Sequence, residues 1–394
     1  MNDKSLKIQT RALHSGRRPS DQRGLVNTPV YRGSTIVSET LKELRSKTIA
    51  DREIGAMIYG RFGTPTTFAL EDAIADLGGG HGGLSLPSGL AAVTTSLLAF
   101  AKPGDHVLVA DTVYGPTRGF CNRMLTSLQI EVEFYDPMIG SDIDRICRPN
   151  TQCIFLESPG SLTFEVQDVP AIVAVAKSRN IVTIIDNTWA TPIFYRPLEL
   201  GVNVSVIAAT KYVVGHADAM LGLIVADEEH YPIVRSCRDV LGQSVAPDDI
   251  YLGLRGLRTL SVRIKQHEHQ TLEIAKWLES HEDVIEVFHP ALTNCPGHEI
   301  WKRDFEGSSG LFSFSLKSKS DDALAAMLDP MKLFSMGYSW GGFESLIVPA
   351  NPQATRSATT WSKPGQLIRV HIGLENVDDL KRDLEQGIQR YYEY

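Results

Sequence analysis

The sequence predicts an α/β protein with a mostly parallel sheet, covered by helices on both faces, and a smaller C-terminal α+β domain. Between about residues 66 and 226, short β-branched runs alternate with amphipathic stretches, an order typical of a parallel sheet. Several runs, such as 181–185 and 204–208, are apolar nearly throughout, which indicates strands buried on both faces. A long helical pattern from Asp248 to His281 then leads into the second region.

The individual elements follow in chain order. Residues 1–60 are polar and irregular and are expected to form an extended arm. Strands of the large sheet are expected at residues 83–87, 106–110, 131–135, 153–156, 181–185, 204–208 and 222–226. Two strands of the smaller region are expected near 310–316 and 367–372. The chain is therefore divided into the arm (1–60), a large α/β domain (61–255) and a C-terminal α+β domain (256–394).

Composition excludes several classes of protein. The 394 residues include 39 Lys and Arg against 47 Asp and Glu, a net charge of −8 that disfavours a nucleic-acid partner. The five cysteines are odd in number and form no C-x-x-C pair, so neither a disulfide framework nor a metal site is predicted. A reducing cytoplasm is the expected location, and no targeting segment is expected because no apolar region follows the basic N-terminus.

One uncharged stretch is long enough to span a bilayer. Residues 77–101 contain no Asp, Glu, Lys or Arg, but glycines and Pro87 interrupt their first half. This stretch is therefore interpreted as a loop, a strand and a helix rather than a membrane span.

Two local motifs are set aside. Gly78-x-Gly80-x-x-Gly83 matches a dinucleotide fingerprint, but it follows a helical stretch and precedes a strand, the reverse of the required order. His267 and His269 are two residues apart on a helix and point apart, so a shared metal is not expected, and their charged neighbours favour a solvated face.

Chemically useful side chains follow the expected strands. Asp186 follows 181–185, Lys211 follows 204–208, and Tyr114 follows 106–110, while Ser88 and Gly89 begin a helix after 83–87. Ligands collect at the carboxyl ends of parallel strands, so these side chains are expected to lie together. Taken singly, each also has an ordinary explanation, such as a helix cap for Asp186 or a solvated lysine for Lys211.

Together, these residue types are those that bind pyridoxal 5'-phosphate. This cofactor needs a lysine amine for a Schiff base and a carboxylate to keep its pyridine nitrogen protonated. It also needs N–H donors at a helix start for its phosphate, and often an aromatic ring on its face. Lysine suits the first task because its pKa falls readily on desolvation.

Nearly the whole chain resembles the transsulfuration family, the pyridoxal-phosphate enzymes of cysteine and methionine metabolism with the aminotransferase-like fold (fold type I). The resemblance is carried by residues 10–16, 59–66, 88–92, 101–105, 112–115, 186–188, 209–216, 255–260, 289–290 and 367–373. It implies a homotetramer made of active dimers and a small amino-acid thioether as substrate.

The resemblance also implies residue roles. Lys211 would bind the cofactor covalently and then move the proton, Asp186 would pair with the pyridine nitrogen, and Tyr114 would stack on the ring. The Gly89 and Leu90 amides would hold the phosphate together with Thr210.

The resemblance implies roles for three further residues, two at a neighbouring subunit's cofactor and one at the substrate. Tyr59 at the end of the arm and Arg61 just after it would reach the cofactor phosphate of a neighbouring subunit, with Tyr59 also near the substrate. Arg369 would bind the substrate α-carboxylate with its planar, bidentate fork.

The branch of the family is indicated by residues 335–345, which contain Tyr338, Ser339 and Trp340. Enzymes acting at the γ carbon typically have Glu and Leu where this chain has Tyr338 and Trp340, so it resembles the bacterial cystathionine β-lyases. That branch implies α,β-elimination, with Ser339 and Trp340 at the substrate. Many family members have Asn at Ser161 and Ser at Ala208, and the second difference removes one phosphate hydroxyl.

Other functions stay open at this point. A cystathionine γ-lyase or γ-synthase or a methionine γ-lyase would share the same motifs, and a pyridoxal-binding regulator without turnover is a more remote alternative. The proton donor to the leaving sulfur is either Lys211 or Tyr114.

Overall fold

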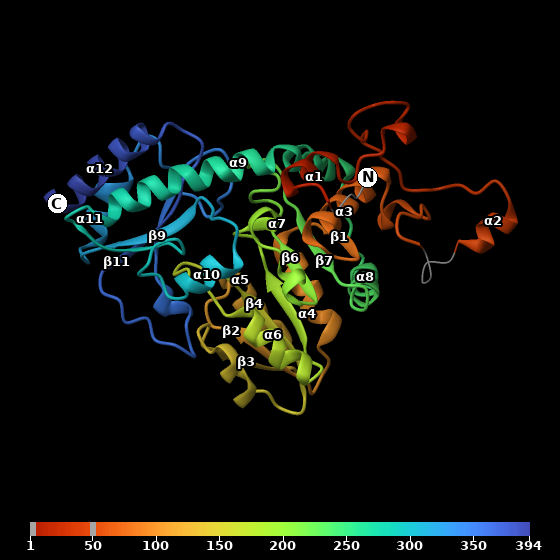
Figure 1. The fold of residues 1–394 in the computed structure, drawn as a ribbon, viewed down its shortest axis with the longest axis horizontal. Coiled ribbons are helices and arrows are strands. Elements are labelled where there is room, and N and C mark those ends of the chain that lie inside the picture. Colours follow the sequence, from red (N-terminus) through yellow and green to blue (C-terminus); the bar gives the residue numbers. More distant parts are fainter. Residues whose placement is uncertain (1–4, 48–52) are drawn as a thin grey trace.

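The computed structural model describes residues 5–47 and 53–394, so residues 1–4 and 48–52 of the expected arm lie outside the described part. The chain forms a seven-stranded sheet with its helices and a smaller four-stranded sheet with its own helices. Figure 1 shows the long helix α9 (Pro247–Glu279) running from the region of the large sheet to that of the small one. The predicted fold class is confirmed by this arrangement.

The large sheet has the strand order β1-β7-β6-β5-β4-β2-β3. All its strands run parallel except β7, which is antiparallel to both β1 and β6. The bounds are β1 (Gly82–Leu86), β2 (His106–Ala110), β3 (Glu131–Tyr135), β4 (Thr151–Glu157), β5 (Val182–Asp186), β6 (Val204–Ile207) and β7 (Gly222–Ala226). All seven predicted strands are present, each within about two residues of the expected bounds.

Helices from the intervening segments pack on this sheet: α3 lies on β1 and β7, α4 on β6 and β7, and α6 on β5. They are α3 (Pro65–Gly78), α4 (Gly89–Phe100), α5 (Gly115–Phe120), α6 (Val169–Ser178), α7 (Thr191–Phe194) and α8 (Tyr231–Val240). The uncharged stretch 77–101 thus forms the end of α3, a loop, β1 and α4, as predicted. Within the described residues, every helix is too short or too polar to cross a bilayer.

The small sheet is antiparallel throughout, in the order β10-β11-β9-β8. It comprises β8 (Val284–Phe288), β9 (Leu311–Leu316), β10 (Leu346–Ala350) and β11 (Gln366–His371), with α10 (His298–Asp304), α11 (Asp321–Leu328) and α12 (Val377–Glu393) around it. The sequence predicted the two central strands and missed β8 and β10. Both missed strands are edge strands with partly exposed residues, and β10 contains Pro349, so neither shows a continuous apolar run.

Helix α9 belongs to two hydrophobic cores. Its first half contributes Ile250, Leu257 and Ile264 to the core around the large sheet, and its last turns contribute Ile274 and Leu278 to the core around the small sheet. The expected domain boundary near residue 255 lies inside this helix and stays a prediction.

The interpretation of His267 as part of a solvated face was wrong. This side chain is fully buried on α9 and its Nδ1 donates to the carbonyl of Ile372 at 2.8 Å. Its charged neighbours in sequence point elsewhere on the helix, so tertiary packing decides its environment.

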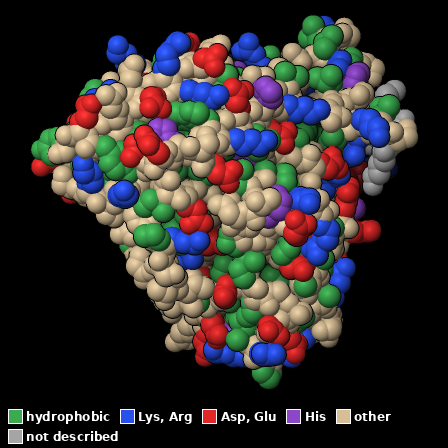
Figure 2. Space-filling view, turned by 60° about the vertical axis from the view of Figure 1, so that its left-hand side comes forward, with side chains coloured by type: hydrophobic (Ala, Val, Ile, Leu, Met, Phe, Trp, Pro, Cys, Tyr) green, Lys and Arg blue, Asp and Glu red, His purple; other side chains and the backbone are tan. Residues whose placement is uncertain are grey.

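The N-terminal segment has little packing of its own. Helix α1 (Ile8–His14) lies on α3 and α9, whereas the segment with α2 (Leu41–Ser46) extends away from the rest of the chain at the right of Figure 1. Val37, Leu41 and Leu44 are exposed there, which is unfavourable for apolar side chains in a single chain. In Figure 2, acidic and basic side chains are interspersed over the face turned to the viewer.

Helix α9 holds the segment that carries Lys211. A Cβ added to Gly256 would lie 2.2 Å from the carbonyl oxygen of Val213, so the helix and this segment are in direct contact. Arg263, about two turns later, donates to the carbonyl of Tyr212 at 2.8 Å. The packing of α9 therefore fixes the backbone next to Lys211.

We expect Gly256→Ala to lower the free energy of unfolding by about 1–3 kcal/mol, because the added methyl group must displace backbone rather than a flexible side chain. Gly33→Ala is the control, since a Cβ there meets no atom within 4 Å, and its effect should stay within about 0.5 kcal/mol. Urea unfolding of both variants measures the difference, and equal midpoints would contradict the close contact.

Candidate active site

A cavity of about 350 Å³ opens at the carboxyl ends of β1, β2, β4, β5 and β6, where the sequence predicted a ligand. The structure brings eight of the predicted site residues into its wall: Gly89, Leu90, Tyr114, Asp186, Thr210, Lys211, Trp340 and Arg369. The parallel strands cause this convergence, since each contributes the residues just after its last buried position. Trp340 and Arg369 come from the C-terminal region, so both sheets contribute to the cavity.

Lys211 lies just beyond β6, largely out of contact with solvent. Its Nζ donates to Ser339 Oγ at 2.8 Å and lies 5.3 Å from the centroid of the Trp340 ring. Burial, with a smaller effect from the positive charge of Arg369, lowers the pKa of Lys211 to about 8, while Asp186 opposes the shift. About a tenth of the amine is therefore neutral at pH 7, against well under a hundredth for an ordinary lysine.

Asp186, the last residue of β5, is fixed by Thr188. Its Oδ1 accepts the Thr188 backbone N–H at 2.9 Å and the Thr188 hydroxyl at 2.5 Å. The same hydroxyl accepts the N–H of Ala208 at 2.8 Å, which ties the end of β5 to the segment after β6. Burial raises the pKa of Asp186, and the bonds from Thr188 and the charge of Lys211 counteract that shift.

Glu157 is a second carboxyl group beside Asp186, and the sequence assigned it no role. It ends β4, directly paired in register with Asp186, and lines the cavity. Its Oε2 accepts the backbone N–H of Tyr114 at 2.7 Å. Burial and then the nearby charge of Asp186 raise the pKa of Glu157 well above its usual value. The sequence signal was present, because Glu157 follows its strand just as Asp186 does.

The start of α4 offers an anion site. Ser88 caps this helix, and its hydroxyl accepts the N–H of Ala91 at 3.1 Å, which leaves the earlier N–H groups of Gly89 and Leu90 without an intrahelical acceptor. A Cβ on Gly89 would lie 2.4 Å from Cβ of Ala208, so only glycine allows the helix to begin this close to the lysine segment. The hydroxyl of Thr210 lines the same corner and accepts the N–H of Leu221 at 2.8 Å.

Arg369 on β11 supplies a partly buried cation to the wall of the same cavity. Its Nη2 lies 3.3 Å from the carbonyl oxygens of Gly337 and Tyr338 and 3.4 Å from that of Ser339. These long bonds leave most of the guanidinium donors free to bind a carboxylate. Burial lowers the pKa of Arg369, and no charged carboxylate is bonded to it in the described residues.

Tyr114 stands at the mouth of the cavity with 47% of its surface exposed. Burial raises the pKa of its hydroxyl, and the charges of Glu157 and Asp186 raise it further. The hydroxyl is therefore protonated at neutral pH. An exposed flat ring next to Asp186 and Lys211 can stack on a bound ring.

Several wall residues could not be found from the sequence. Leu162 and Phe164 line the cavity, and their φ angles are 69° and 62°. These are left-handed values that are uncommon for residues other than glycine, so the sequence gives no reason to expect them. Trp189 also lines the cavity and donates its indole N–H to the carbonyl of Leu311 at 2.9 Å. Ser161, where many family members have Asn, lies in the same wall.

Within the described residues, the wall of the cavity does not include Tyr59 or Arg61 of the same chain. Tyr59 is 44% exposed, and Arg61 donates to the carbonyl of Asp239 at 2.7 Å. Their prediction concerned a neighbouring subunit, and it stays a prediction.

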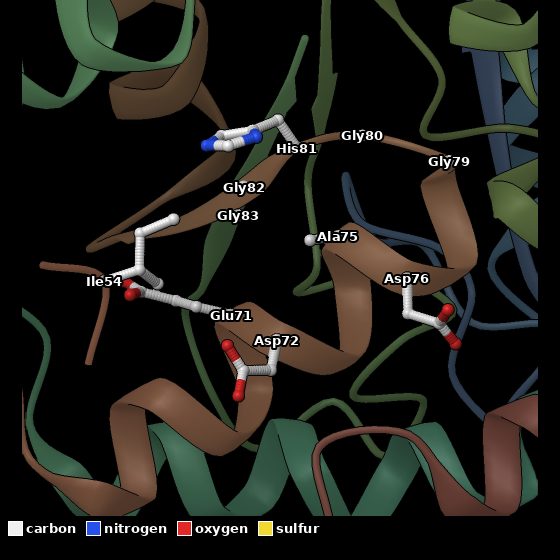
Figure 3. A pocket seen from close by; sticks show the side chains of 10 residues that line it. All are labelled: Ile54, Glu71, Asp72, Ala75, Asp76, Gly79, Gly80, His81, Gly82 and Gly83. Carbon is white, nitrogen blue, oxygen red and sulfur yellow. The ribbon is translucent and has the colours of Figure 1, made fainter. Parts of the chain in front are cut away.

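A second concave region lies beside α3 (Figure 3). Its carboxylates already have partners: Glu71 pairs with Arg238 at 2.9 Å and Asp76 with Arg11 at 3.0 Å. Among the described residues, no group of His, Cys, Asp and Glu could hold a metal ion. Its wall includes Gly80 and Gly83 of the fingerprint-like run. This run leads from the last residue of α3 into β1, the helix-then-strand order that the sequence indicated, so it is not a dinucleotide site.

The donor set of the cavity fits pyridoxal phosphate. The Gly89 and Leu90 amides and the Thr210 hydroxyl suit the phosphate, Asp186 suits the pyridine nitrogen, and Lys211 has a largely buried amine of lowered pKa.

Comparison with known proteins agrees with this fit. Residues 9–389 match the family model of Cys/Met metabolism PLP-dependent enzymes. The chain is 46% identical to cystathionine beta-lyase MetC of Escherichia coli, with 98% of each chain covered, and 40% identical to an L-alanine/L-glutamate racemase of Wolbachia pipientis, with 98% of each covered. The crystal structure of metB from Corynebacterium glutamicum superimposes with a TM-score of 0.89 at 29% identity, with 98% of each chain covered.

The lowered pKa of Lys211 predicts how the chain captures its cofactor. Only the neutral amine attacks, so the rate of covalent capture by cofactor-free protein should rise with pH and level off above about 8. Arg369→Met removes a positive charge that lowers this pKa, so the plateau should move to higher pH. Stopped-flow absorbance measures both profiles, with Arg123→Met as an exposed control. An unchanged midpoint in Arg369→Met would contradict the assigned electrostatics.

We expect Lys211→Ala to lose both activity and the absorbance band of lysine-bound cofactor, while the phosphate corner still binds pyridoxal phosphate non-covalently. Absorbance spectra and equilibrium dialysis measure the two properties. A variant that keeps the band and the activity would overturn the assignment of Lys211.

Proposed function

Because the chain belongs to the family of Cys/Met metabolism PLP-dependent enzymes, we propose that it is a carbon–sulfur lyase that cleaves L-cystathionine. The reaction is an α,β-elimination that yields homocysteine, pyruvate and ammonia, and cystine-like β-thioethers are further substrates. The observation that carries this proposal is the contact of Lys211 with Ser339, beside Trp340, in a loop whose sequence resembles that of β-lyases.

The chain's own residues support each requirement of this reaction. When bound, pyridoxal phosphate supplies an electron sink for the charge that develops at Cα. Arg369 binds the substrate α-carboxylate and fixes the orientation of Cα. The amine of Lys211, whose pKa is about 8, takes the Cα proton, and the hydroxyl of Ser339 holds that amine in place.

The leaving sulfur receives its proton from Lys211 or Tyr114. Lys211 carries the abstracted proton and lies inside the cavity, while Tyr114 stands at its mouth with a protonated hydroxyl. Each of the two side chains can therefore act as the acid that protonates the leaving sulfur.

The arm is proposed to complete the active site of a neighbouring subunit within a homotetramer, with Tyr59 and Arg61 reaching its cofactor phosphate and Tyr59 its substrate. The support is that the segment with α2 extends from the rest of the chain (Figure 1), and that its apolar side chains Val37, Leu41 and Leu44 are exposed. The division into arm (1–60), cofactor domain (61–255) and C-terminal domain (256–394) is part of this proposal. All five cysteines are free thiols, which supports the cytoplasm as the proposed location.

Product identity tests the proposed reaction. With L-cystathionine, we expect pyruvate to exceed 2-oxobutyrate, because γ-elimination needs a second proton abstraction at Cβ. Predominant 2-oxobutyrate would indicate a γ-lyase, D-alanine or D-glutamate from the L-isomers would indicate a racemase, and no turnover of any thioether would indicate a binding protein. Each of these three results contradicts the proposal.

Subunit mixing tests the arm. Arg61→Ala and Lys211→Ala each inactivate a different half of a shared site, so hybrids of the two should regain part of the activity. A mixture of Asp186→Ala with Lys211→Ala is the matched control, because both residues belong to one chain's cavity and no hybrid site is intact. If the first mixture regains no more activity than the control after subunit exchange is shown by mass spectrometry, the arm does not cross the interface.

A further inference from the structure

His371, the last residue of β11, has no place in the chemistry described above, yet it is fully buried directly behind the loop 335–345. Its Nε2 lies 3.1 Å from the backbone nitrogen of Gly341, and its Nδ1 lies 3.1 Å from the carbonyl oxygen of Glu344. An amide N–H can only donate and a carbonyl can only accept. The ring is therefore the neutral tautomer with its proton on Nδ1, and both nitrogens bind this loop.

These two bonds act next to the reacting lysine. Gly341 directly follows Ser339 and Trp340, the two loop residues that contact the Lys211 amine. A Cβ on Gly341 would lie 2.9 Å from the backbone carbon of Lys211, so the loop rests on the lysine's own main chain at this point. The Gly341 N–H therefore marks where the loop is fixed relative to Lys211.

The rest of the loop tip is held more loosely. Tyr338 is 93% exposed, and the contacts from Arg369 to the tip carbonyls measure 3.3–3.4 Å. Under the proposed function, Arg369 also has to bind the substrate carboxylate, so its donors are shared. At the other end, Ser345 is anchored through its hydroxyl to Glu375 at 2.8 Å. Between that anchor and the tip, His371 bonds the loop at two points.

We propose that His371 is a positioning residue that holds Ser339 and Trp340 against the Lys211 amine, chiefly by accepting the Gly341 N–H. This inference rests on the proposed function for its kinetic consequence, but not for the loop geometry itself. Without the bond, the Gly341 N–H loses its partner and the tip moves relative to Lys211. The Cα proton is then taken less efficiently, while the carboxylate is still bound by Arg369.

Two conservative variants separate the two bonds. In His371→Gln, the side-chain oxygen can occupy the position of Nε2 and accept the Gly341 N–H. In His371→Asn, the side-chain amide can occupy the position of Nδ1 and donate only to Glu344. His371→Phe keeps a ring but neither bond. His267→Asn is the matched control, since His267 is equally buried, its ring centroid is 5.2 Å from that of His371, and it bonds Ile372 instead of the loop.

The first measurement is hydrogen exchange of residues 335–345 in the full-length protein, with and without pyridoxal phosphate and without substrate. We expect faster exchange of this segment in His371→Asn and His371→Phe, and near-normal exchange in His371→Gln and His267→Asn. The second is steady-state kinetics, where kcat should fall about tenfold in His371→Asn with KM changed less than about threefold.

Wild-type exchange and kcat in His371→Asn would overturn the proposal, as would equal losses in His371→Gln and His371→Asn. If none of the variants folds, the unmodified protein still decides: the Gly341 amide must exchange more slowly than those of Tyr338 and Ser339, and fast exchange at Gly341 overturns the proposal. Exchange is measured without substrate, so a failure of the proposed reaction on cystathionine is distinguishable from a failure here.

Discussion

The central physical constraint is the burial of a lysine amine to which no carboxylate within residues 5–47 and 53–394 is directly bonded. The Nζ of Lys211 donates to the hydroxyl of Ser339 and lies over the ring of Trp340. Asp186 attracts the charged amine and Arg369 repels it, both without a hydrogen bond to it. A bonded carboxylate would keep the amine charged and unreactive. The desolvation that makes the amine reactive has to be provided by packing from several directions, and this requirement explains the two-part architecture.

Packing around Lys211 is provided jointly by the two regions of the chain. Helix α9 supports the lysine segment from one side through Gly256 and Arg263, and the loop carrying Trp340 covers it from the other. The segment between β10 and β11 adds a third contact between the two regions. Its Arg356 guanidinium lies 2.6 Å from Glu165 Oε1, and its Thr359 backbone N–H donates to Asp111 at 2.8 Å. The Arg356–Glu165 pair is almost fully buried, so removing one partner alone would leave an unpaired buried charge. The C-terminal region is therefore held at the cavity by polar contacts of defined geometry.

The sequence predicted what depends on local patterns. Strands of the parallel sheet could be predicted because both of their faces are buried, which gives continuous apolar runs. Asp186 and Lys211 could be singled out because they follow such runs. The edge strands β8 and β10 were not readable, since half-exposed residues give no continuous apolar run. Nor was the environment of His267, whose burial depends on contacts between α9 and the distant Ile372. The left-handed backbone of Leu162 and Phe164 has no glycine to signal it. Long-range contacts decide all of these features.

The carboxyl pair at the ends of β4 and β5 shows how neighbouring groups divide their tasks. Glu157 and Asp186 are paired in register, and the charge of Asp186 disfavours the ionisation of Glu157. Asp186 receives two hydrogen bonds from Thr188 and the attraction of Lys211, whereas Glu157 receives one bond, from the Tyr114 backbone. Glu157 therefore keeps its proton to higher pH than Asp186 does. Asp186 ionises first of the two, and an ionised carboxylate is the form that pairs with a protonated pyridine nitrogen. Glu157 accepts the Tyr114 N–H and so fixes the backbone that carries the Tyr114 ring.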